Sequence, residues 1–375
     1  MAGHHDKKRR QSYTLNPYEI AVCGYSNSGK TTLATELVEA FAVDHRVGYV
    51  KNAHDFDLDK PGKDSWRAAE AGATDIFVSA QSKTATISRR PADKFSQQRH
   101  LIDADCVIVE GFKQSPLAKV VMIDEQSRIL TDDVDLQNVI AYAGIAESAG
   151  DLAAPYFQRD AITDIKAAVD SYFATVTSAR PLNGLVLAGG KSTRMQRDKA
   201  ALDYHGKPQV MHAFDLLASH CSKAFVSSRP EQDEDDTIGQ LPRIHDRFLG
   251  MGPMGGILSA MHEHPDAAWL ILACDLPFVD NPLLAHLLKH RNPMRPASAY
   301  NSTNDGFPEP LCAIYEPKCI FQLLHFLGLG YSCPRKVLIN TEIENLEQPG
   351  SGALDNINDP DEFAAARERL HSNRP

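Results

Sequence analysis

EIAVCGYSNSGKTTLATELVEAFAV, residues 19–43, runs from a short apolar segment through a glycine-rich turn into a stretch with helical spacing of its apolar residues. Gly24, Gly29, Lys30 and Thr31 satisfy the pattern GxxxxGK[ST], in which glycines let backbone N–H groups approach a phosphate chain closely. The N-terminus of the following helix adds a potential that favours anions. The order strand, turn, helix therefore predicts a nucleotide-binding P-loop, and the alternative is an ordinary glycine turn capped by Ser28.

Around this stretch, strand-like and helix-like segments alternate over residues 18–174, which predicts a parallel sheet covered by helices. The strand-like segments are EIAVCGY, RVGYVKN, DIFVSA, CVIVEGF, AKVVMID and NVIAYAG. A second alternating set begins after Arg180-Pro181 and includes NGLVLAGG, KAFVSS, RIHD and AAWLILACD. Residues from about 293 to 358 are less periodic, which suits substrate-binding loops or a small subdomain.

We therefore expect an α/β protein of two doubly wound, three-layer domains. The predicted order is a disordered basic tail (1–17), a P-loop domain (18–177), a linker (178–182) and a second domain (183–375). The length of 375 residues fits two domains, because single cores rarely exceed about 250 residues.

Composition excludes several classes of function. The formal net charge of −10 disfavours a broad nucleic-acid surface, and no apolar run approaches the ~18 residues of a membrane span. Seven cysteines, an odd number without a CxxC pair, indicate free thiols in a reducing compartment. We expect a cytoplasmic protein that binds neither nucleic acid nor membrane.

Within the first glycine loop, Lys30 is expected to neutralise the β and γ phosphates, and Thr31 offers its hydroxyl to Mg²⁺. Glu110 ends an apolar strand, where it would be a second acidic ligand of that ion or simply an exposed strand-end side chain. The predicted nucleotide-binding residues of this loop are Gly24, Asn27, Ser28, Gly29, Lys30, Thr31 and Thr32.

Between these motifs, residues 52–73 form a polar loop that leads into a helix opened by Ser65. The loop contains His54, Asp55, Asp57, Asp59 and Lys63. Such a cluster is able to hold a metal ion, but consecutive acids in a Pro-Gly loop are more often solvated.

Three motifs, GYSNSGKTTL, HDFDLDKPGKDSWRAAEAGA and VIVEGFKQSPLAKVV, together resemble the MobB family, the P-loop partner in synthesis of the molybdopterin guanine dinucleotide cofactor. The resemblance covers nearly all of residues 18–175. It implies GTP binding with weak hydrolysis and an accessory role. Asp55 departs from the family pattern, which often has a second His there.

A second glycine loop lies in LVLAGGKSTRMQRDKAAL, residues 185–202, where Lys191, Arg194, Arg197 and Lys199 fall within nine residues. Cations spread along a glycine turn suit a triphosphate that is cleaved and whose pyrophosphate is held as it leaves. The alternative is a basic surface turn.

Two carboxylates follow strands of the second half. AAWLILACDLPF is a buried strand ending at Asp275, and RIHDRFLGMGPMGGI supplies Asp246 with a glycine run before a helix. Carboxylates at the carboxyl ends of sheet strands point into the crevice where α/β proteins bind ligands, and they are able to carry Mg²⁺.

LAGGKSTRM, DKA, GPMGGI, CDLPF and LDNINDPDEF resemble the MobA family of molybdenum cofactor guanylyltransferases over residues 183–370. The resemblance implies a Rossmann-like, GT-A-type nucleotidyltransferase domain. It implies that GTP is bound by Leu187, Ala188, Gly189, Gly190, Lys191, Lys199, Asp246 and Asp275, with Arg194 in the same signature, Mg²⁺ on Asp275, and Asn356 and Asn358 on the pterin side. Gln196, Ser228 and the segment FPEPLCAIYEPK depart from the family pattern, so the choice of base is less defined than the type of reaction.

The function expected from these motifs is transfer of GMP from GTP to molybdenum-molybdopterin, with Lys199, Arg194 and Asp275 as the catalytic residues. Molybdopterin-insertion proteins and apo-molybdoenzymes are the expected partners. Two alternatives stay open: a cytidylyltransferase or sugar-nucleotide pyrophosphorylase of the same fold, and a GTP-gated module that delivers a metal or cofactor.

Overall fold

The computed structural model describes residues 16–51, 53, 56, 58–90, 99–132, 134–146, 151–188, 199–229, 240–350, 352–357 and 359–372. The chain divides into two compact units between Tyr172 and Phe173, inside helix α6 (Ile162–Ser178).

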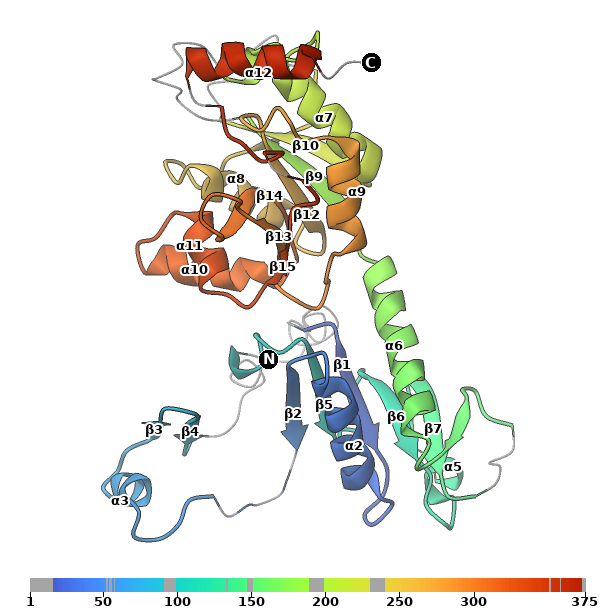
Figure 1. Ribbon diagram of the computed structural model, residues 1–375. Helices are drawn as coiled ribbons and strands as arrows, with labels where there is room; N and C mark the ends of the chain where they lie inside the picture. The colour runs from blue at the N-terminus through green and yellow to red at the C-terminus, as the bar shows by residue number, and fades with distance from the viewer. Residues whose placement is uncertain are drawn as a thin grey trace, which may run out of the picture. The chain divides into compact units, whose positions relative to one another are not determined.

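The first unit is built on a six-stranded sheet in the order β2-β5-β1-β6-β7-β8, in which every pairing is parallel (Figure 1). Its strands are β1 (Glu19–Cys23), β2 (Val47–Lys51), β5 (Cys106–Glu110), β6 (Ala118–Met122), β7 (Val139–Gly144) and β8 (Tyr156–Gln158). Both β5 and β6 are buried over their whole length, as expected for strands covered on both faces. The predicted parallel sheet is confirmed.

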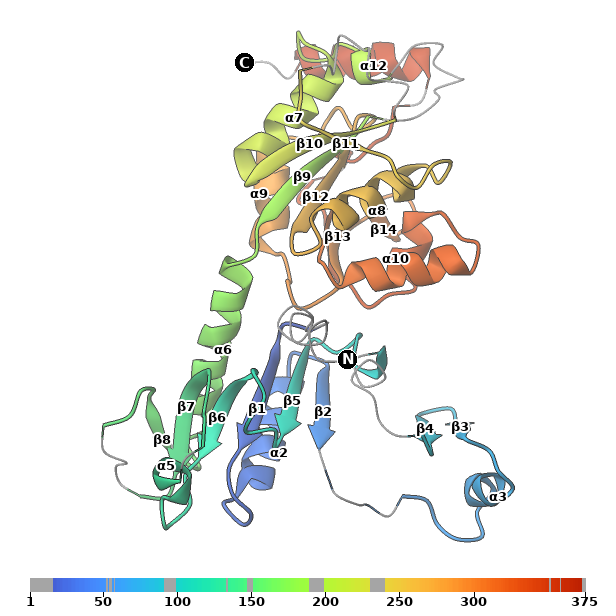
Figure 2. The ribbon, with the colours of Figure 1, turned by 180° about the vertical axis from the view of Figure 1, so that it is seen from behind.

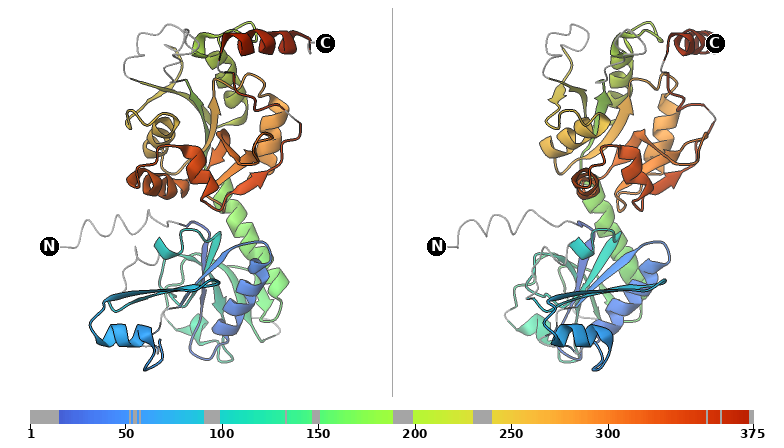
Figure 3. Two further views of the ribbon diagram at one scale, coloured as in Figure 1. Left: turned by 60° about the vertical axis from the view of Figure 1, so that its left-hand side comes forward. Right: turned by 90° about the vertical axis from the view of Figure 1, so that its left-hand side faces the viewer.

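Helix α2 (Lys30–Ala42) follows β1 through the P-loop and buries Leu33, Leu37 and Phe41. These residues recur at helical spacing, so one stripe of the helix faces the core. The Lys166 ammonium of α6 lies 4.4 Å from the centre of the Phe41 ring, and the two helices run side by side (Figure 3). A short helix, α5 (Arg128–Thr131), follows β6.

Residues 75–88 correct one expectation about the first sheet. DIFVSA forms β3 (Asp75–Ser79), which pairs antiparallel with β4 (Thr84–Ser88) in a separate two-stranded sheet beside α3 (Asp64–Glu70). The tight turn explains the difference, because the Ala80 N–H donates to the Lys83 carbonyl, and parallel pairing needs a long crossover.

The expected disordered tail, residues 1–17, extends too far, because its last residues are part of the folded first unit. Asn16 is buried, and its side-chain amide donates to the Ala104 carbonyl at 2.8 Å. The remainder of the tail lies outside the described residues.

The second unit contains a seven-stranded mixed sheet in the order β11-β10-β9-β12-β14-β13-β15 (Figure 2). Its strands are β9 (Leu182–Leu187), β10 (Lys223–Ser228), β11 (Arg243–His245), β12 (Ala268–Ala273), β13 (Ala297–Asn301), β14 (Pro308–Tyr315) and β15 (Glu344–Leu346). Only β14 runs antiparallel to its neighbours. The fold is thus α/β in both units, with parallel pairing throughout the first sheet and from β11 to β12 in the second.

Helices cover both faces of the second sheet, as alternate residues of β12 indicate. Leu270 and Leu272 pack in a core with α7 (Gln209–His220) and α9 (Asn281–Lys289). Trp269 and Ile271 pack in another core with α8 (Pro253–Glu263), α10 (Cys319–Gly328) and α11 (Pro334–Ile339). Because side chains alternate along a strand, these two cores lie on opposite faces, and the expected three layers are present here.

Residues 293–358 form no separate subdomain. They contribute β13, β14 and β15 to the same sheet, so the expectation of a subdomain is wrong, although the loops between these strands border the hollows described below. The chain continues to α12 (Pro360–Ser372), whose Phe363 packs edge-on against the buried Tyr204. None of the helices described here has the length and apolar character needed to cross a bilayer.

Candidate functional site

The P-loop between β1 and α2 has the backbone that its glycines predict. A Cβ on Gly24 would lie 2.6 Å from Ser28 Oγ and 2.9 Å from Met122 Cβ, so only glycine fits. Gly29 has φ +90°, in the left-handed region that glycine adopts freely, and Asn27 has φ 65°. Lys30 Nζ donates to the Tyr25 carbonyl at 3.3 Å, so its ammonium lies folded over the loop.

One end of this loop brings together two of the predicted metal ligands. The Thr31 hydroxyl donates to Glu110 Oε1 at 2.7 Å, since β1 and β5 are parallel neighbours whose carboxyl ends meet at one edge. Glu110 is buried, with 4% of its surface exposed. A hydroxyl and a carboxylate are oxygen donors that suit Mg²⁺, so the residues present fit that ion.

Tyr49 and Lys51, two residues that sequence reasoning missed, hold the other carboxylate oxygen of Glu110. The Tyr49 hydroxyl donates to Oε2, and Lys51 Nζ lies 3.3 Å from the same atom. Burial raises the pKa of Glu110, but the hydrogen bonds from Tyr49, Thr31 and Lys51 outweigh it and lower the pKa below its ordinary value. Burial and the bond to Glu110 raise the pKa of Tyr49 to about 12.

Cations gather around the second residue of the P-loop. The ring of Tyr25 has Lys113 Nζ 4.4 Å and the Arg128 guanidinium 5.1 Å from its centre. The Tyr25 hydroxyl donates to Asp132, and Arg128 pairs with Asp124. Two cations and two carboxylates thus lie around Tyr25, and their formal charges cancel.

In the second unit, the ends of β9 and β12 bring predicted residues together. The Cys274 N–H donates to the Leu187 carbonyl at 3.4 Å, which sets Asp275 beside Leu187 and Ala188. The Ile357 N–H donates to the Asp275 carbonyl at 3.0 Å. Asn356 therefore lies next to Asp275 in space, although about eighty residues separate them along the chain.

Asp246 lies on the same edge, one strand beyond. Its N–H donates to the Ser228 carbonyl, and the Ser227 hydroxyl donates to its Oδ1 at 2.6 Å. Burial raises the pKa of Asp246. The hydrogen bond from Ser227 and the charge of the nearby Arg229 lower it by less, so the pKa lies above its ordinary value. Ser227 is a further residue that sequence reasoning missed, and its place at the end of KAFVSS was the available signal.

The predicted cation loop is largely outside the described residues. Lys199 begins the short helix η1 (Lys199–Ala201). The predicted residues Gly189, Gly190, Lys191, Arg194 and Asn358, the departure at Gln196, and the cluster residues His54, Asp55 and Asp57 lie outside the part of the chain that the structure describes.

A hollow of about 440 Å³ adjoins the strand ends of the second unit. Its lining includes the glycine turn at Gly250–Pro253, Leu276, Glu309, Arg335 and Asn356. Arg335 donates to Glu309 at 3.0 Å and to Asp305 at 2.9 Å. Leu276 and Asn356 adjoin Asp275 through the chain and the Ile357 hydrogen bond, so this hollow opens beside the predicted metal ligand.

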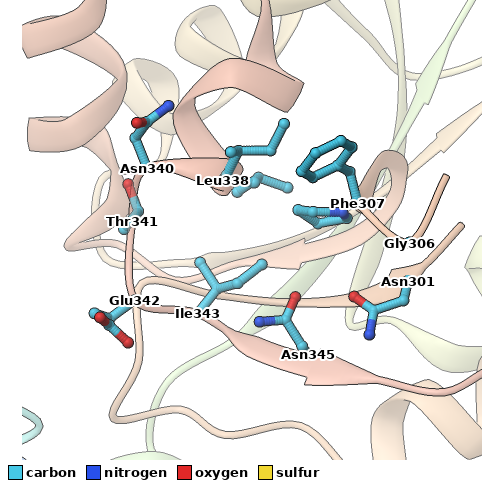
Figure 4. Close-up of a pocket in the computed structure, with 11 residues that line it drawn as sticks. Asn301, Gly306, Phe307, Leu338, Asn340, Thr341, Glu342, Ile343 and Asn345 are labelled. Atoms are coloured by element: carbon cyan, nitrogen blue, oxygen red, sulfur yellow. The ribbon is translucent and has the colours of Figure 1, made fainter.

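A larger hollow, of about 550 Å³, lies between β13, β15 and α11 (Figure 4). Its lining contains Asn301, Phe307, Thr341, Glu342 and Asn345, and none of its eleven lining residues is lysine or arginine. Without a cation it is poorly suited to phosphate, and it contains none of the predicted site residues. The strand ends at Asp275 are therefore the better candidate site.

Comparison with known proteins gives two family matches. Residues 19–144 match the model described as molybdopterin guanine dinucleotide synthesis protein B, and residues 184–344 match the MobA-like NTP transferase domain.

Three relatives extend these matches. A Synechocystis protein named molybdenum cofactor biosynthesis bifunctional protein is 37% identical over 186 residues, which are 50% of this chain and 54% of that protein, so about half of its length is matched. A Haemophilus influenzae molybdopterin-guanine dinucleotide biosynthesis adapter protein is 35% identical over 33% of this chain and 72% of its own length. A Nostoc probable molybdenum cofactor guanylyltransferase is 29% identical over 49% of this chain and 89% of its own length.

Proposed function

This chain belongs to the molybdopterin-guanine dinucleotide biosynthesis adapter family through its MobB domain, which a MobA-like NTP transferase domain follows, and we propose that it transfers GMP from GTP to molybdenum-molybdopterin. The products are the guanine dinucleotide cofactor and pyrophosphate. The P-loop unit is proposed to bind GTP as an accessory domain with weak hydrolysis.

The observation that carries the proposal is the meeting of Asp275, Leu187 and Asn356 at one edge of the second sheet. A carboxylate at the carboxyl ends of the strands and an adjoining hollow are what a nucleotidyltransferase needs to align two substrates.

The reaction requires no protein nucleophile. The terminal phosphate of molybdopterin attacks the α-phosphorus of GTP in line, a new phosphoanhydride bond forms, and the bond to the pyrophosphate oxygen breaks. Lys199 and Arg194 are proposed to neutralise charge on the leaving pyrophosphate, and main-chain amides of residues 188–190 orient the phosphate chain. Mg²⁺ held by Asp275 would supply a further positive charge at the reacting phosphate.

Asp246 is proposed to contact the nucleotide, and Asn356 and Asn358 the pterin side, which opens onto the 440 Å³ hollow. Insertion proteins and apo-molybdoenzymes are the proposed partners. All seven cysteines are free, which fits the reducing cytoplasm as the site of action.

The test compares two carboxylates at opposite ends of one strand. Asp275 follows β12, and the exposed Asp266 precedes it. Asp275→Ala is expected to lower dinucleotide formation by on the order of 100-fold or more, because a charge that acts on the transition state is lost. Asp266→Ala is expected to leave the rate unchanged. Product formation is measured with molybdopterin, Mg²⁺ and each of the four NTPs.

Wild-type turnover in Asp275→Ala would refute the assignment of this residue. Dinucleotide formed from CTP in place of GTP would change the proposed base but keep the reaction type. Absence of pyrophosphate with every NTP would refute the transferase itself and favour a delivery module.

A further inference from the structure

Arg159 lies against the P-loop although it comes from the far side of the first sheet. It follows β8, and its N–H donates to the Gly144 carbonyl at the end of β7 at 2.7 Å. A Cβ built on Gly29 would lie 3.3 Å from Arg159 Cδ and 3.5 Å from Nη1. The side chain therefore extends across the end of β6 and touches the loop that precedes α2.

Among the described residues, the guanidinium has no anionic partner. Within the described part of the chain, no hydrogen bond or ion pair engages the side chain of Arg159, which is exposed to solvent. Arg128, whose guanidinium lies near the Tyr25 ring, by contrast pairs with Asp124. In the described part of the chain, Arg159 is thus a cation positioned by its backbone hydrogen bond to Gly144 and by its contact with Gly29.

The surroundings make this position electrostatically unfavourable in the absence of a ligand. Gly29 caps α2, and the N-terminus of a helix carries a partial positive charge that repels cations. Lys30 begins the same helix, so two full positive charges lie beside that partial charge. A bound anion would offset the positive charge of these three groups.

We propose that Arg159 binds the phosphate chain of the nucleotide held by the P-loop, as a second cation beside Lys30. This inference rests on the proposed GTP binding by the first unit. The guanidinium offers planar, paired N–H donors to phosphate oxygens, whereas Lys30 offers a point charge.

The sheet order places this contact on a defined side of the phosphate chain. Glu110 ends β5, which pairs with β1 on one side, while β6, β7 and β8 lie on the other. Thr31 and Glu110 therefore form the metal corner on the β5 side, and Arg159 approaches from the β8 side. The negative charge of the phosphate chain would then be offset on one side by the metal ion and on the other by Arg159.

The experiment titrates the full-length protein with GTP and Mg²⁺ by calorimetry. Because the second unit is also proposed to bind GTP, the Lys30→Ala variant identifies which binding component belongs to the P-loop. Arg159→Ala is expected to weaken that component about 10- to 100-fold, because a charge-assisted hydrogen bond to phosphate is lost. Arg159→Lys should retain part of the affinity, and Arg67→Ala, an exposed arginine on α3, should retain all of it.

Thermal melts of the same variants separate binding from packing. Arg159→Ala is expected to melt without ligand at the same temperature as the wild type or higher, since a like charge beside the α2 N-terminus is removed, while its stabilisation by GTP shrinks. An unchanged P-loop component in Arg159→Ala would overturn the inference and leave GTP binding intact. A lower melting temperature without ligand, with unchanged affinity, would assign Arg159 to packing. If no component disappears in Lys30→Ala, both the proposed accessory function and this inference fail.

Discussion

His212 shows what burial does to one titratable side chain. Its ring stacks on that of His205 with the centroids 3.7 Å apart, and His205 Nε2 lies 3.0 Å from the carbonyl oxygen of Pro277. Burial, with smaller contributions from His205 and Lys207, lowers the pKa of His212 to about 4. The folded protein thus keeps this imidazole neutral in mildly acidic solution.

Stability should therefore fall as the pH falls from about 6.5 to about 4. In this window the unfolded His212 takes up a proton that the folded one refuses, and above pH 6.5 neither form is protonated, so the residue has no effect there. We expect the free energy of unfolding to fall by on the order of 2 kcal/mol between pH 7 and pH 5. His212→Gln should abolish this fall. His371→Gln, at an exposed histidine, should show the same fall as the wild type. Urea denaturation at pH 7 and pH 5 measures it, and equal losses in all three proteins would contradict the assignment.

Single residues also mark the limit of sequence reasoning about the site. Thr31 and Glu110 were predictable, because both follow recognisable patterns and the parallel pairing of β1 with β5 brings them together. Tyr49 and Lys51 were not, since nothing in RVGYVKN indicates that β2 pairs with β5 in a register that sets Lys51 opposite Glu110. Arg159 was missed for the same reason, as its contact with the P-loop depends on how far β8 lies along the sheet.

At the scale of one element, helix α8 packs unusually close to the sheet. A Cβ on Gly256 would lie 2.5 Å from Ser227 Oγ and 2.8 Å from Leu187 Cδ2. The helix can approach the ends of β9 and β10 only because this position has no side chain.

Gly256→Ala is therefore expected to destabilise the second unit by about 1–3 kcal/mol, the usual cost of overpacking. Gly328→Ala, in α10 with no atom within 4 Å of the new Cβ, should be neutral or stabilising by up to about 1 kcal/mol. Thermal unfolding of the two variants measures the contrast. A Gly256→Ala protein as stable as the wild type would mean that α8 moves away at little cost.

Strands were predictable from the sequence where a short, continuous run of apolar residues marked them. Segments such as CVIVEGF and AAWLILACD gave β5 and β12, because a continuous apolar run marks a strand buried on both faces. DIFVSA was assigned to the wrong sheet, since its hairpin partner, β4, lies in the exposed and weakly apolar segment TATIS. The strands after residue 293 were missed because β14 runs antiparallel to both of its neighbours, which breaks the alternation that the prediction used.

At the scale of the whole molecule, each unit has its own sheet and its own buried core, and each carries one candidate nucleotide site. A change confined to one site should therefore affect one activity. Lys30→Ala is expected to abolish GTP hydrolysis, because the charge on the β and γ phosphates is lost, and to leave guanylyl transfer unchanged in vitro. Both rates are measured on the full chain, with Asp275→Ala as the reciprocal variant. Loss of guanylyl transfer in Lys30→Ala would show that the transferase site depends on nucleotide binding at the P-loop.

Cys333 places an exposed thiol in the hollow beside Asp275. Burial raises the pKa of the Cys312 and Cys319 thiols to about 12, which makes them poor nucleophiles, whereas Cys333 is exposed and lines the hollow with Arg335 and Asn356. A small alkylating reagent would therefore label the native protein where the acceptor is proposed to bind. Slower labelling would report occupancy directly, without an engineered probe.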